Sequence, residues 1–329
     1  MIIKTIISLI LLNVTIIESK VRSQSTSGHN EDQRKCYQTK DELSLTKLEP
    51  IFEAEPCGDH QPLSIFIPST ATTDGVSYLK RQTQRKTLVS EAKENNISVY
   101  FMIALSENQT TNELLKEESN RYKDMIQMQF IDNYWNLTLK SVSILRWAQN
   151  KCNNSKLIIK TDDDTVLNIN NLLNSWDQFK SGITGSLLSY SFLELECQAS
   201  RYNKVNHMKK INMPYALGPI YAITTDVIPK LLSTLETYSG RILDQEDLFV
   251  TGVLAKEAGV PLFEGLRIIY RGLPFKCGIH NQIALTCCIS GEDLVRNYEN
   301  WKNSQSCVRV PGYSKSIAHS SLISSSMKF

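Results

Sequence analysis

The stretch that decides the fold is Leu157-Ile-Ile-Lys160-Thr-Asp162-Asp163-Asp164, an apolar run that passes directly into three consecutive aspartates. A short apolar run of this kind is typical of a strand buried on both faces of a parallel sheet. In open α/β sheets, ligands bind in the crevice beyond the carboxyl ends of the strands, where the three aspartates would lie. Adjacent carboxylates repel one another unless a positive charge is close. The triplet therefore predicts a divalent cation such as Mn²⁺ or Mg²⁺, bridging to phosphate oxygens. A solvated acidic turn is the alternative, because Asp is a common turn residue.

On both sides of this stretch, strand-like and helix-like segments alternate. Apolar runs predict strands at 63–67, 99–105, 125–130, 157–159 and 221–224. Between and after them, helices are expected at 81–93, 111–122, 136–149, 169–179 and 227–235. Strands that alternate with helices of this length predict an α/β fold with a mostly parallel central sheet flanked by helices.

Length and composition limit the classes of protein to consider. The chain has 329 residues, of which 41% are hydrophobic and 21% charged, which is enough for one large globular domain. Lys and Arg total 36 against 34 acidic residues, so no strongly basic face is expected and no nucleic-acid partner is predicted.

The two ends of the chain differ in composition from its central region. An apolar run at 5–17 predicts entry into the secretory pathway, as a signal-anchor or a cleaved signal peptide within residues 1–20. The polar segment 21–60 predicts a stem or linker, 61–310 a single catalytic domain, and 311–329 a Ser-rich tail. In that compartment the eight cysteines are candidates for disulfides. Four sequons for N-glycosylation follow the apolar run, at Asn96, Asn108, Asn136 and Asn153.

A second acidic group, Asp244-Gln-Glu246-Asp247, precedes the helix-like segment 248–256. One interpretation places these residues in an N-cap and first helical turn, where the helix dipole stabilises carboxylates. The other makes one carboxylate a general base, held near the donor site by the start of the helix.

Six ordered sequence elements together give the chain a specific resemblance. They are Arg81-Gln-Thr-Gln-Arg85-Lys-Thr87; Glu118 with Tyr122 and Asp124; Asp132-Asn-Tyr-Trp-Asn136-Leu-Thr-Leu-Lys140; Lys160-Thr-Asp-Asp-Asp164 with Asn168; Pro214-Tyr-Ala-Leu-Gly218 with Tyr221; and Glu246-Asp247 with Gly252. Over about residues 62–307 the chain resembles the β1,3-galactosyltransferase family, glycosyltransferase family 31.

Three positions depart from the family pattern. Ile220 stands where the second Gly of the Pro-Tyr element usually lies, and the Glu-Asp element reaches its Gly one residue late. The family usually has a His before its Ile-Ser-x-Glu-Glu segment, in a place typical of a metal ligand. Here Cys287 occupies that position, and His280 lies nearby without a motif match. A thiolate prefers softer metals than Mn²⁺.

The resemblance implies a GT-A-type fold, a UDP-sugar donor, Mn²⁺ or another divalent cation, and inversion at the anomeric carbon. On this basis Asp164 and Asp162 would hold the metal, and Asp247, rather than Glu246, would be the general base. Lys160, Asp162 and Asp163 would bind the cofactor, as would Arg81 and Arg85, for which a solvated helix face is the alternative. The expected enzyme is a Golgi hexosyltransferase, a type II membrane protein acting on a glycoprotein or glycolipid glycan. A catalytically silent relative that binds glycans or assists another transferase is the rival interpretation.

Overall fold

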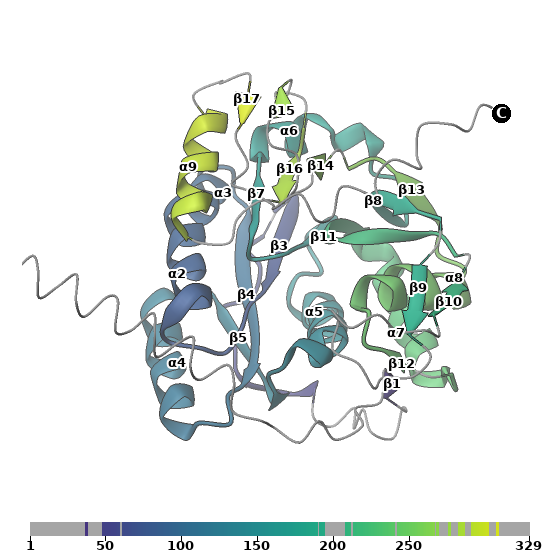
Figure 1. Ribbon diagram of the computed structural model, residues 1–329, viewed down its shortest axis with the longest axis horizontal. Coiled ribbons are helices and arrows are strands. Elements are labelled where there is room, and N and C mark those ends of the chain that lie inside the picture. Colours follow the sequence, from purple (N-terminus) through teal and green to yellow (C-terminus); the bar gives the residue numbers. More distant parts are fainter. Residues whose placement is uncertain are drawn as a thin grey trace, which may run out of the picture. The chain divides into compact units, whose positions relative to one another are not determined.

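In the computed structural model, an eight-stranded sheet forms the centre of the fold, in the order β13-β8-β11-β6-β3-β4-β5-β2 (Figure 1). In that order the strands are Leu262–Glu264, Ile183–Leu188, Tyr215–Thr224, Leu157–Thr161, Leu63–Pro68, Ser98–Leu105, Met125–Ile131 and Pro50–Phe52. The pairs β13–β8, β6–β3, β3–β4 and β4–β5 are parallel, and β11 and β2 run against their neighbours. All strands except β11 and β2 therefore point the same way, which confirms the prediction of a mostly parallel sheet.

The structure describes residues 37–38, 48–59, 61–189, 191–194, 208–211, 213–240, 242–266, 268–269, 276–277, 282–286, 291–302 and 307–308. Except for Glu194, they fall in one compact unit made of Tyr37–Leu193 and Met208–Phe329; the chain's other unit, Met1–Cys36 with Glu194–His207, otherwise lies outside the described residues. No helix in these ranges is long and apolar enough to cross a bilayer. The predicted anchor at 1–20 and the tail at 311–329 lie outside the described residues.

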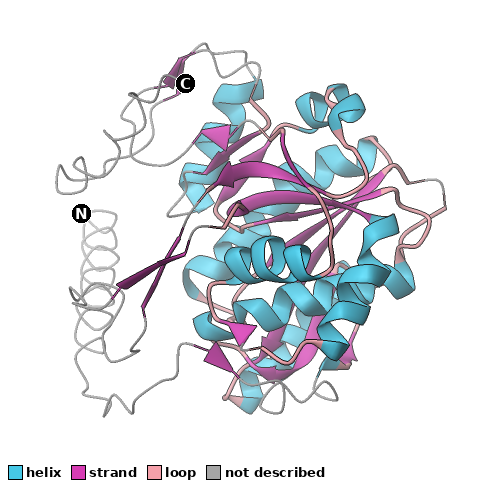
Figure 2. Cartoon of the chain, turned by 90° about the vertical axis from the view of Figure 1, so that its right-hand side faces the viewer, coloured by secondary structure: helices cyan, strands magenta, loops and turns pink. Residues whose placement is uncertain are grey.

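Helices cover both faces of the sheet because successive side chains of a strand point to opposite sides (Figure 2). In β4, Tyr100, Met102 and Ala104 pack with one hydrophobic cluster, and Val99, Phe101 and Ile103 pack with the other. The first cluster includes residues of α5 (Leu137–Lys151), α7 (Ile228–Thr237) and the π-helical segment η6 (Leu248–Leu254). The second includes residues of η2 (Arg85–Val89), α3 (Ser90–Glu94), α4 (Gln109–Tyr122) and α6 (Ile169–Asn174).

Two helices differ from the expected ones by more than a few residues. The first helical stretch begins earlier than residue 81, with α2 at Gly75–Gln84, and continues through η2 and α3. Gly75 has a φ of 66°, a backbone conformation that glycine adopts without strain. The helix expected over 169–179 ends with α6 at Asn174, and a separate 3₁₀ turn, η4, follows at Trp176–Gln178.

A small three-stranded sheet lies next to the aspartate triplet. Its strand β7 (Thr165–Leu167) begins directly after Asp164 and pairs antiparallel with β16 (Ala284–Thr286), with Thr165 opposite Thr286. Since β16 also pairs with β14 (Ile268–Ile269), the C-terminal part of the domain is joined to the chain that leaves the triplet.

The predicted stem extends too far along the chain. Leu48 and Ala54 are each 5% exposed in the hydrophobic core, and β2 pairs with β5 at the edge of the sheet. The folded domain therefore includes residues 48–59, which the sequence places in the stem. Their sequence lacks a sustained period because they contribute one short edge strand and irregular backbone.

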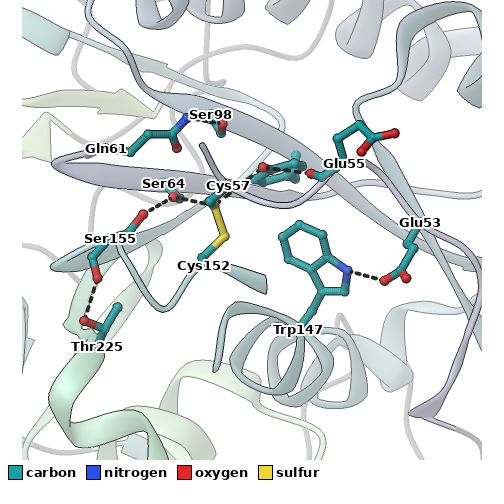
Figure 3. The surroundings of a disulfide bond; sticks show 11 residues. Glu53, Glu55, Cys57, Gln61, Ser64, Ser98, Trp147, Cys152, Ser155 and Thr225 are labelled. Carbon is teal, nitrogen blue, oxygen red and sulfur yellow. Dashed lines mark hydrogen bonds between the residues drawn. A yellow bond between two sulfur atoms is a disulfide. The ribbon is translucent and has the colours of Figure 1, made fainter. Parts of the chain in front are cut away.

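One disulfide, Cys57–Cys152, joins this N-terminal segment to the end of α5 (Figure 3). The Cys57 backbone N–H donates to the Lys151 carbonyl at 2.9 Å, and Trp147 of α5 donates through Nε1 to Glu53 at 2.9 Å. The sulfur of Cys57 also lies 2.9 Å from the hydroxyl oxygen of Ser64. The bond thus fastens the edge segment to the core across a sequence separation of 95.

Replacing both cysteines, as Cys57→Ser with Cys152→Ser, is expected to reduce the free energy of unfolding by about 2–5 kcal/mol, because a long loop is released in the unfolded chain. Urea unfolding followed by fluorescence measures this loss. Glu117→Gln, which changes an exposed residue of α4, is the control and should unfold like the wild type. An unchanged midpoint in the double variant would mean that the non-covalent contacts alone hold the segment.

Candidate active site

Strand β6 ends at the aspartate triplet, and its alternation decides which side chains share a face. Ile158 packs in the cluster of α5 and η6, so Lys160 and Asp162, two and four residues further along, lie on the same side. Tyr221 of β11 is opposite Lys160 in the register and also belongs to that cluster. The helical segment that follows Glu246-Asp247 packs on this side as well.

Lys160 is the centre of the site, with a side chain that is 2% exposed. Its ammonium group donates to Asp162 Oδ1 at 2.6 Å and to the Gly218 carbonyl at 2.7 Å, and lies 3.4 Å from Glu246 Oε2. Burial by itself would lower the pKa of Lys160, but the carboxylates of Asp162 and Glu246 raise the pKa above its usual range. The group stays charged at every physiological pH and connects the two acidic elements.

The Glu246 side chain is buried and hydrogen-bonded within the protein. It is 3% exposed, and its Oε1 accepts a hydrogen bond from the Tyr221 hydroxyl at 2.5 Å. Burial and the nearby Glu246 charge raise the pKa of Tyr221 well above its usual value, so the phenol remains a donor. With Tyr221 on one oxygen and Lys160 near the other, Glu246 is placed to orient neighbours rather than to receive a proton from a ligand.

Asp247 lies at the beginning of η6 and is only partly buried. Its Oδ1 accepts from the backbone N–H of Leu248, and its Oδ2 from that of Gly218, both at 2.9 Å. Burial and the charge of Glu246 raise the pKa of Asp247 to about 6, against the opposing effect of the backbone donors and Lys160. A carboxylate with this pKa is ionised at pH 7 and more basic than an ordinary aspartate, which suits a general base.

Gly218 allows the two acidic elements to approach each other. A Cβ at this position would lie 3.2 Å from Asp247 Oδ2, closer than ordinary contact. The same residue donates its N–H to Asp247 and accepts from Lys160 through its carbonyl. The departure at Ile220 does not affect this contact, because Ile220 is fully buried in the cluster on the opposite face.

The three aspartates have different surroundings. Asp162 accepts from Lys160 through one oxygen, and its side chain is still 35% exposed. Asp163 pairs with Lys80 of α2 at 3.0 Å. Asp164 is partly exposed beside β7. Within the described ranges, no three His, Cys, Asp or Glu side chains gather to form a complete metal site.

A nucleotide-bound cation does not need a complete protein site. Such ions are commonly held by one or two carboxylates, with phosphate oxygens and water as the other ligands. Asp162 and Asp164 supply this set of hard oxygen donors at the carboxyl end of β6, so these residues fit a divalent cation. His280 and Cys287, the candidates for a further ligand, lie outside the described residues.

The prediction that Arg81 binds the nucleotide is wrong. Arg81 is fully buried, and its five N–H groups donate to Glu118 twice and to three acceptors of the loop after β3, Ser69 Oγ, Thr70 O and Thr72 O. A guanidinium has five donors. None is left for a phosphate, so the role of Arg81 is to hold the loop after β3 against α4.

Arg85 belongs to the same buried network. It forms a bidentate pair with Asp124, at 2.7 and 2.8 Å, and a further ion pair with Glu118 at 2.6 Å. Its guanidinium also lies over the ring of Tyr122, 3.9 Å from the centroid. These acidic partners raise the pKa of Arg85, although burial opposes the shift. These partners give Arg85 a structural role, and Lys160 has one as well, because its ammonium group lies near three protein oxygens. Binding of cofactor by Arg85 or Lys160 stays a prediction.

Arg81→Lys is expected to reduce the free energy of unfolding by about 1–3 kcal/mol, because a lysine cannot satisfy all the buried acceptors around Arg81. UDP affinity of the folded protein should stay within about twofold of the wild-type value. Urea unfolding and calorimetry measure the two quantities, with the exposed Arg121→Lys as control. Weaker UDP binding at unchanged stability would restore the nucleotide-binding role.

Sequence reasoning missed some partners in these networks. Glu118, Tyr122 and Asp124 were recognised as a motif but not as the partners of Arg81 and Arg85. Arg81 and Arg85 are four residues apart, as are Glu118 and Tyr122, so each pair lies on one face of its helix. This spacing could have suggested that the two helix faces meet. No comparable signal identifies Lys80 as the partner of Asp163.

The chain is similar in sequence to known proteins. The family profile described as Galactosyltransferase matches residues 79–264. Beta-1,3-galactosyltransferase 1 of Homo sapiens is 24% identical over 263 residues, which cover 78% of each chain. UDP-GalNAc:beta-1,3-N-acetylgalactosaminyltransferase 1 of Mus musculus is 25% identical over 240 residues, covering 67% of this chain and 68% of the relative. Among solved structures, galactosyltransferase LgtC in complex with donor and acceptor sugar analogs overlaps with a TM-score of 0.35, at 10% identity over 63% of this chain and 75% of that chain.

The family profile and the sequence relatives define an enzyme of the glycosyltransferase class. Because the family profile spans more than half of the sequence, the chain belongs to the galactosyltransferase family.

Proposed function

We propose that the protein is an inverting β1,3-hexosyltransferase that moves a sugar, galactose in the first instance, from a UDP-sugar to a hydroxyl of a glycan acceptor. The observation that carries this proposal is the pairing of Asp247 with the aspartate triplet through Lys160 and Gly218. It brings a carboxylate with a raised pKa close to an oxygen-donor site for a diphosphate-bound cation. Inversion takes place in one displacement. It requires a base that acts on the acceptor and, at the same time, a positive charge that stabilises the leaving group.

Asp247 takes the proton of the acceptor hydroxyl as its oxygen attacks the anomeric carbon. The backbone donors of Gly218 and Leu248 hold the Asp247 carboxylate in place, so that one orientation is presented to the acceptor. Lys160 and Tyr221 keep Glu246 inside, and Lys160 holds Asp162 at the end of β6. A divalent cation held by Asp164 and Asp162 would supply positive charge to the departing diphosphate.

The direct test is a transfer assay on the purified chain with Mn²⁺ and UDP-galactose, UDP-N-acetylglucosamine or UDP-N-acetylgalactosamine. We expect transfer or donor hydrolysis with at least one of them, and a β-linked product. The names of the relatives support galactose and N-acetylgalactosamine as the first donors to try. Failure with all three donors in the presence of acceptor glycans would contradict the proposal.

Removing the cation ligands gives a second prediction. Asp162→Asn with Asp164→Asn is expected to weaken Mn²⁺-dependent UDP binding by at least about tenfold, because two anionic oxygen ligands are lost. Calorimetry with UDP, with and without Mn²⁺, measures the effect. The exposed Asp177→Asn is the control, since it lies in the η4 turn and should bind UDP as the wild type does. Equal Mn²⁺-dependent affinity in the double variant would place the cation elsewhere.

We place the protein in the Golgi membrane as a type II protein, or in the secreted fraction if the N-terminus is cleaved. The apolar run at 5–17, the sequons and the disulfide between Cys57 and Cys152 support passage through the secretory pathway. Microscopy of the tagged full chain against a Golgi marker tests this placement.

A further inference from the structure

We propose that the folded protein carries N-linked glycans on Asn96, Asn108 and Asn153, and none on Asn136, although all four residues stand in acceptor sequons. The inference rests on the proposed passage through the secretory pathway and does not depend on the transferase activity. Its basis is that the four asparagine side chains have very different surroundings.

The modification needs an oligosaccharide on a lipid diphosphate and the membrane-bound transferase of the secretory pathway. The Nδ2 atom of asparagine forms a bond to the anomeric carbon and gives up one proton. The bond between that carbon and the diphosphate oxygen breaks, and the lipid diphosphate leaves with the electron pair. In the finished protein, Nδ2 must therefore point where a large polar sugar can reach solvent.

Asn136 does not meet this condition. It is 8% exposed, and its Nδ2 donates to the Ile131 carbonyl at 2.8 Å. Its backbone N–H is bound by the Asn133 side chain at 2.9 Å, which holds the residue in the turn before α5. A glycan on Nδ2 would have to be accommodated between this turn and the end of β5.

The other side chain that defines this sequon is also part of the fold. Thr138 is 3% exposed, and its hydroxyl donates to the Leu243 carbonyl at 2.7 Å, across a sequence separation of 105. A buried hydroxyl does not by itself separate the sequons, because Ser155 of the Asn153 sequon is 1% exposed and lies 2.7 Å from the Ser64 hydroxyl. The distinction rests on the asparagine that would carry the glycan. A chain modified on Asn136 before folding could not bury this side chain, so it would be absent from the folded population.

The other three asparagines are exposed. Asn108 caps α4 by accepting the Thr111 N–H through Oδ1, which leaves its Nδ2 directed away from that bond. Asn96 lies in the turn between α3 and β4 with a φ of 54°. Asn153 directly follows the disulfide-bonded Cys152.

Their places in the sheet also agree with modification. Asn96 precedes β4 and Asn153 precedes β6, so both lie at the amino ends of parallel strands, whereas the aspartate triplet follows the carboxyl end of β6. Glycans at these two positions leave the opposite edge open for donor and acceptor. Asn108 follows the carboxyl end of β4, which β3 separates from β6.

The experiment uses the full chain, expressed in a eukaryotic secretory host and purified as soluble or detergent-solubilised folded protein. Peptide-N-glycosidase in H₂¹⁸O converts each glycosylated Asn to ¹⁸O-labelled Asp, and peptide mass spectrometry reads each site. We expect label at 96, 108 and 153 and none at 136. Label at 136 in the folded protein, or its absence at any of the other three sites, overturns the corresponding assignment.

Variants separate the glycan from the structural role of Asn136. Asn96→Gln, Asn108→Gln and Asn153→Gln should each remove the mass of one glycan in a gel and leave a folded protein. Asn136→Gln should leave the glycan mass unchanged and lower the yield of folded chain. If the variant does not fold, the ¹⁸O measurement on the wild type still decides the assignment, and neither readout requires an active transferase.

Discussion

Asp247→Asn is expected to reduce turnover by at least about 100-fold while leaving UDP affinity within about twofold of the wild-type value. A positioned general base contributes about 10²–10⁴-fold, and an amide cannot accept the acceptor proton at neutral pH. The variant keeps the size of the side chain, and its amide oxygen can accept one of the two backbone N–H groups that bind Asp247, those of Gly218 and Leu248, so the fold should persist. Initial rates with saturating donor, together with calorimetry for UDP, measure the two effects.

The pH profile gives the same variant a second readout. The raised pKa of Asp247, about 6, means that the base is protonated and inactive as the pH falls through that value. The wild-type rate should therefore decline by about tenfold per pH unit below pH 6 and be nearly constant above it. Asp247→Asn should lose this acid limb from its residual rate.

The control for Asp247→Asn is Glu257→Gln, which removes an exposed carboxylate at the end of α8 (Ala255–Glu257). It should retain wild-type turnover and the acid limb. Turnover of Asp247→Asn within about threefold of the wild type would remove Asp247 from the role of base. Glu246 would then be the next carboxylate to consider.

Lys160→Met is expected to reduce the free energy of unfolding by about 3–5 kcal/mol and to abolish measurable transfer. The substitution keeps most of the side-chain volume but leaves Glu246 buried without its cation, and removing one partner of a buried ion pair costs about this much. Asp162 loses its contact at the end of β6, and the Gly218 carbonyl loses a donor. Urea unfolding and the transfer assay measure the two losses.

Two further variants make this prediction specific. Lys156→Met, at an exposed position just before β6, is the matched control and should be as stable and active as the wild type. In Lys160→Met with Glu246→Gln, the buried charge is removed as well, so at least about 1 kcal/mol of the lost stability should return. Stability equal to the wild type in Lys160→Met, or no recovery in the double variant, would contradict the ion-pair account.

Much of the fold could be predicted because local pattern and burial agree in the central strands. The apolar runs at 99–105 and 157–159 coincide with β4 and β6, which are buried on both faces and so have no polar side to confuse the pattern. Residues 48–59 could not be assigned correctly. Their place at the sheet edge depends on β5, more than 70 residues further along, and on the disulfide to Cys152.

The candidate site, too, could be predicted from the sequence only in part. The chain's own pattern was sufficient to single out the aspartate triplet and the Glu246-Asp247 pair, because clustered carboxylates beside apolar runs are costly and uncommon. It could not show that Arg81 is held by Glu118 and the loop after β3, or that Arg85 is held by Glu118 and Asp124. A guanidinium in a helix looks the same in sequence whether its partner is a phosphate or a distant carboxylate.

By itself, therefore, the amino-acid sequence determined the α/β architecture, the family and the two acidic elements, since these depend on periodicity and on short ordered motifs. Only the tertiary structure decided which charged side chains are paired inside the protein and which can act on a ligand. Lys160, Gly218 and Glu246 are brought within hydrogen-bond or ion-pair distance across 58 and 86 residues of chain. Burial at that meeting point raises the pKa of Asp247 and leaves it as the carboxylate suited to accept a proton.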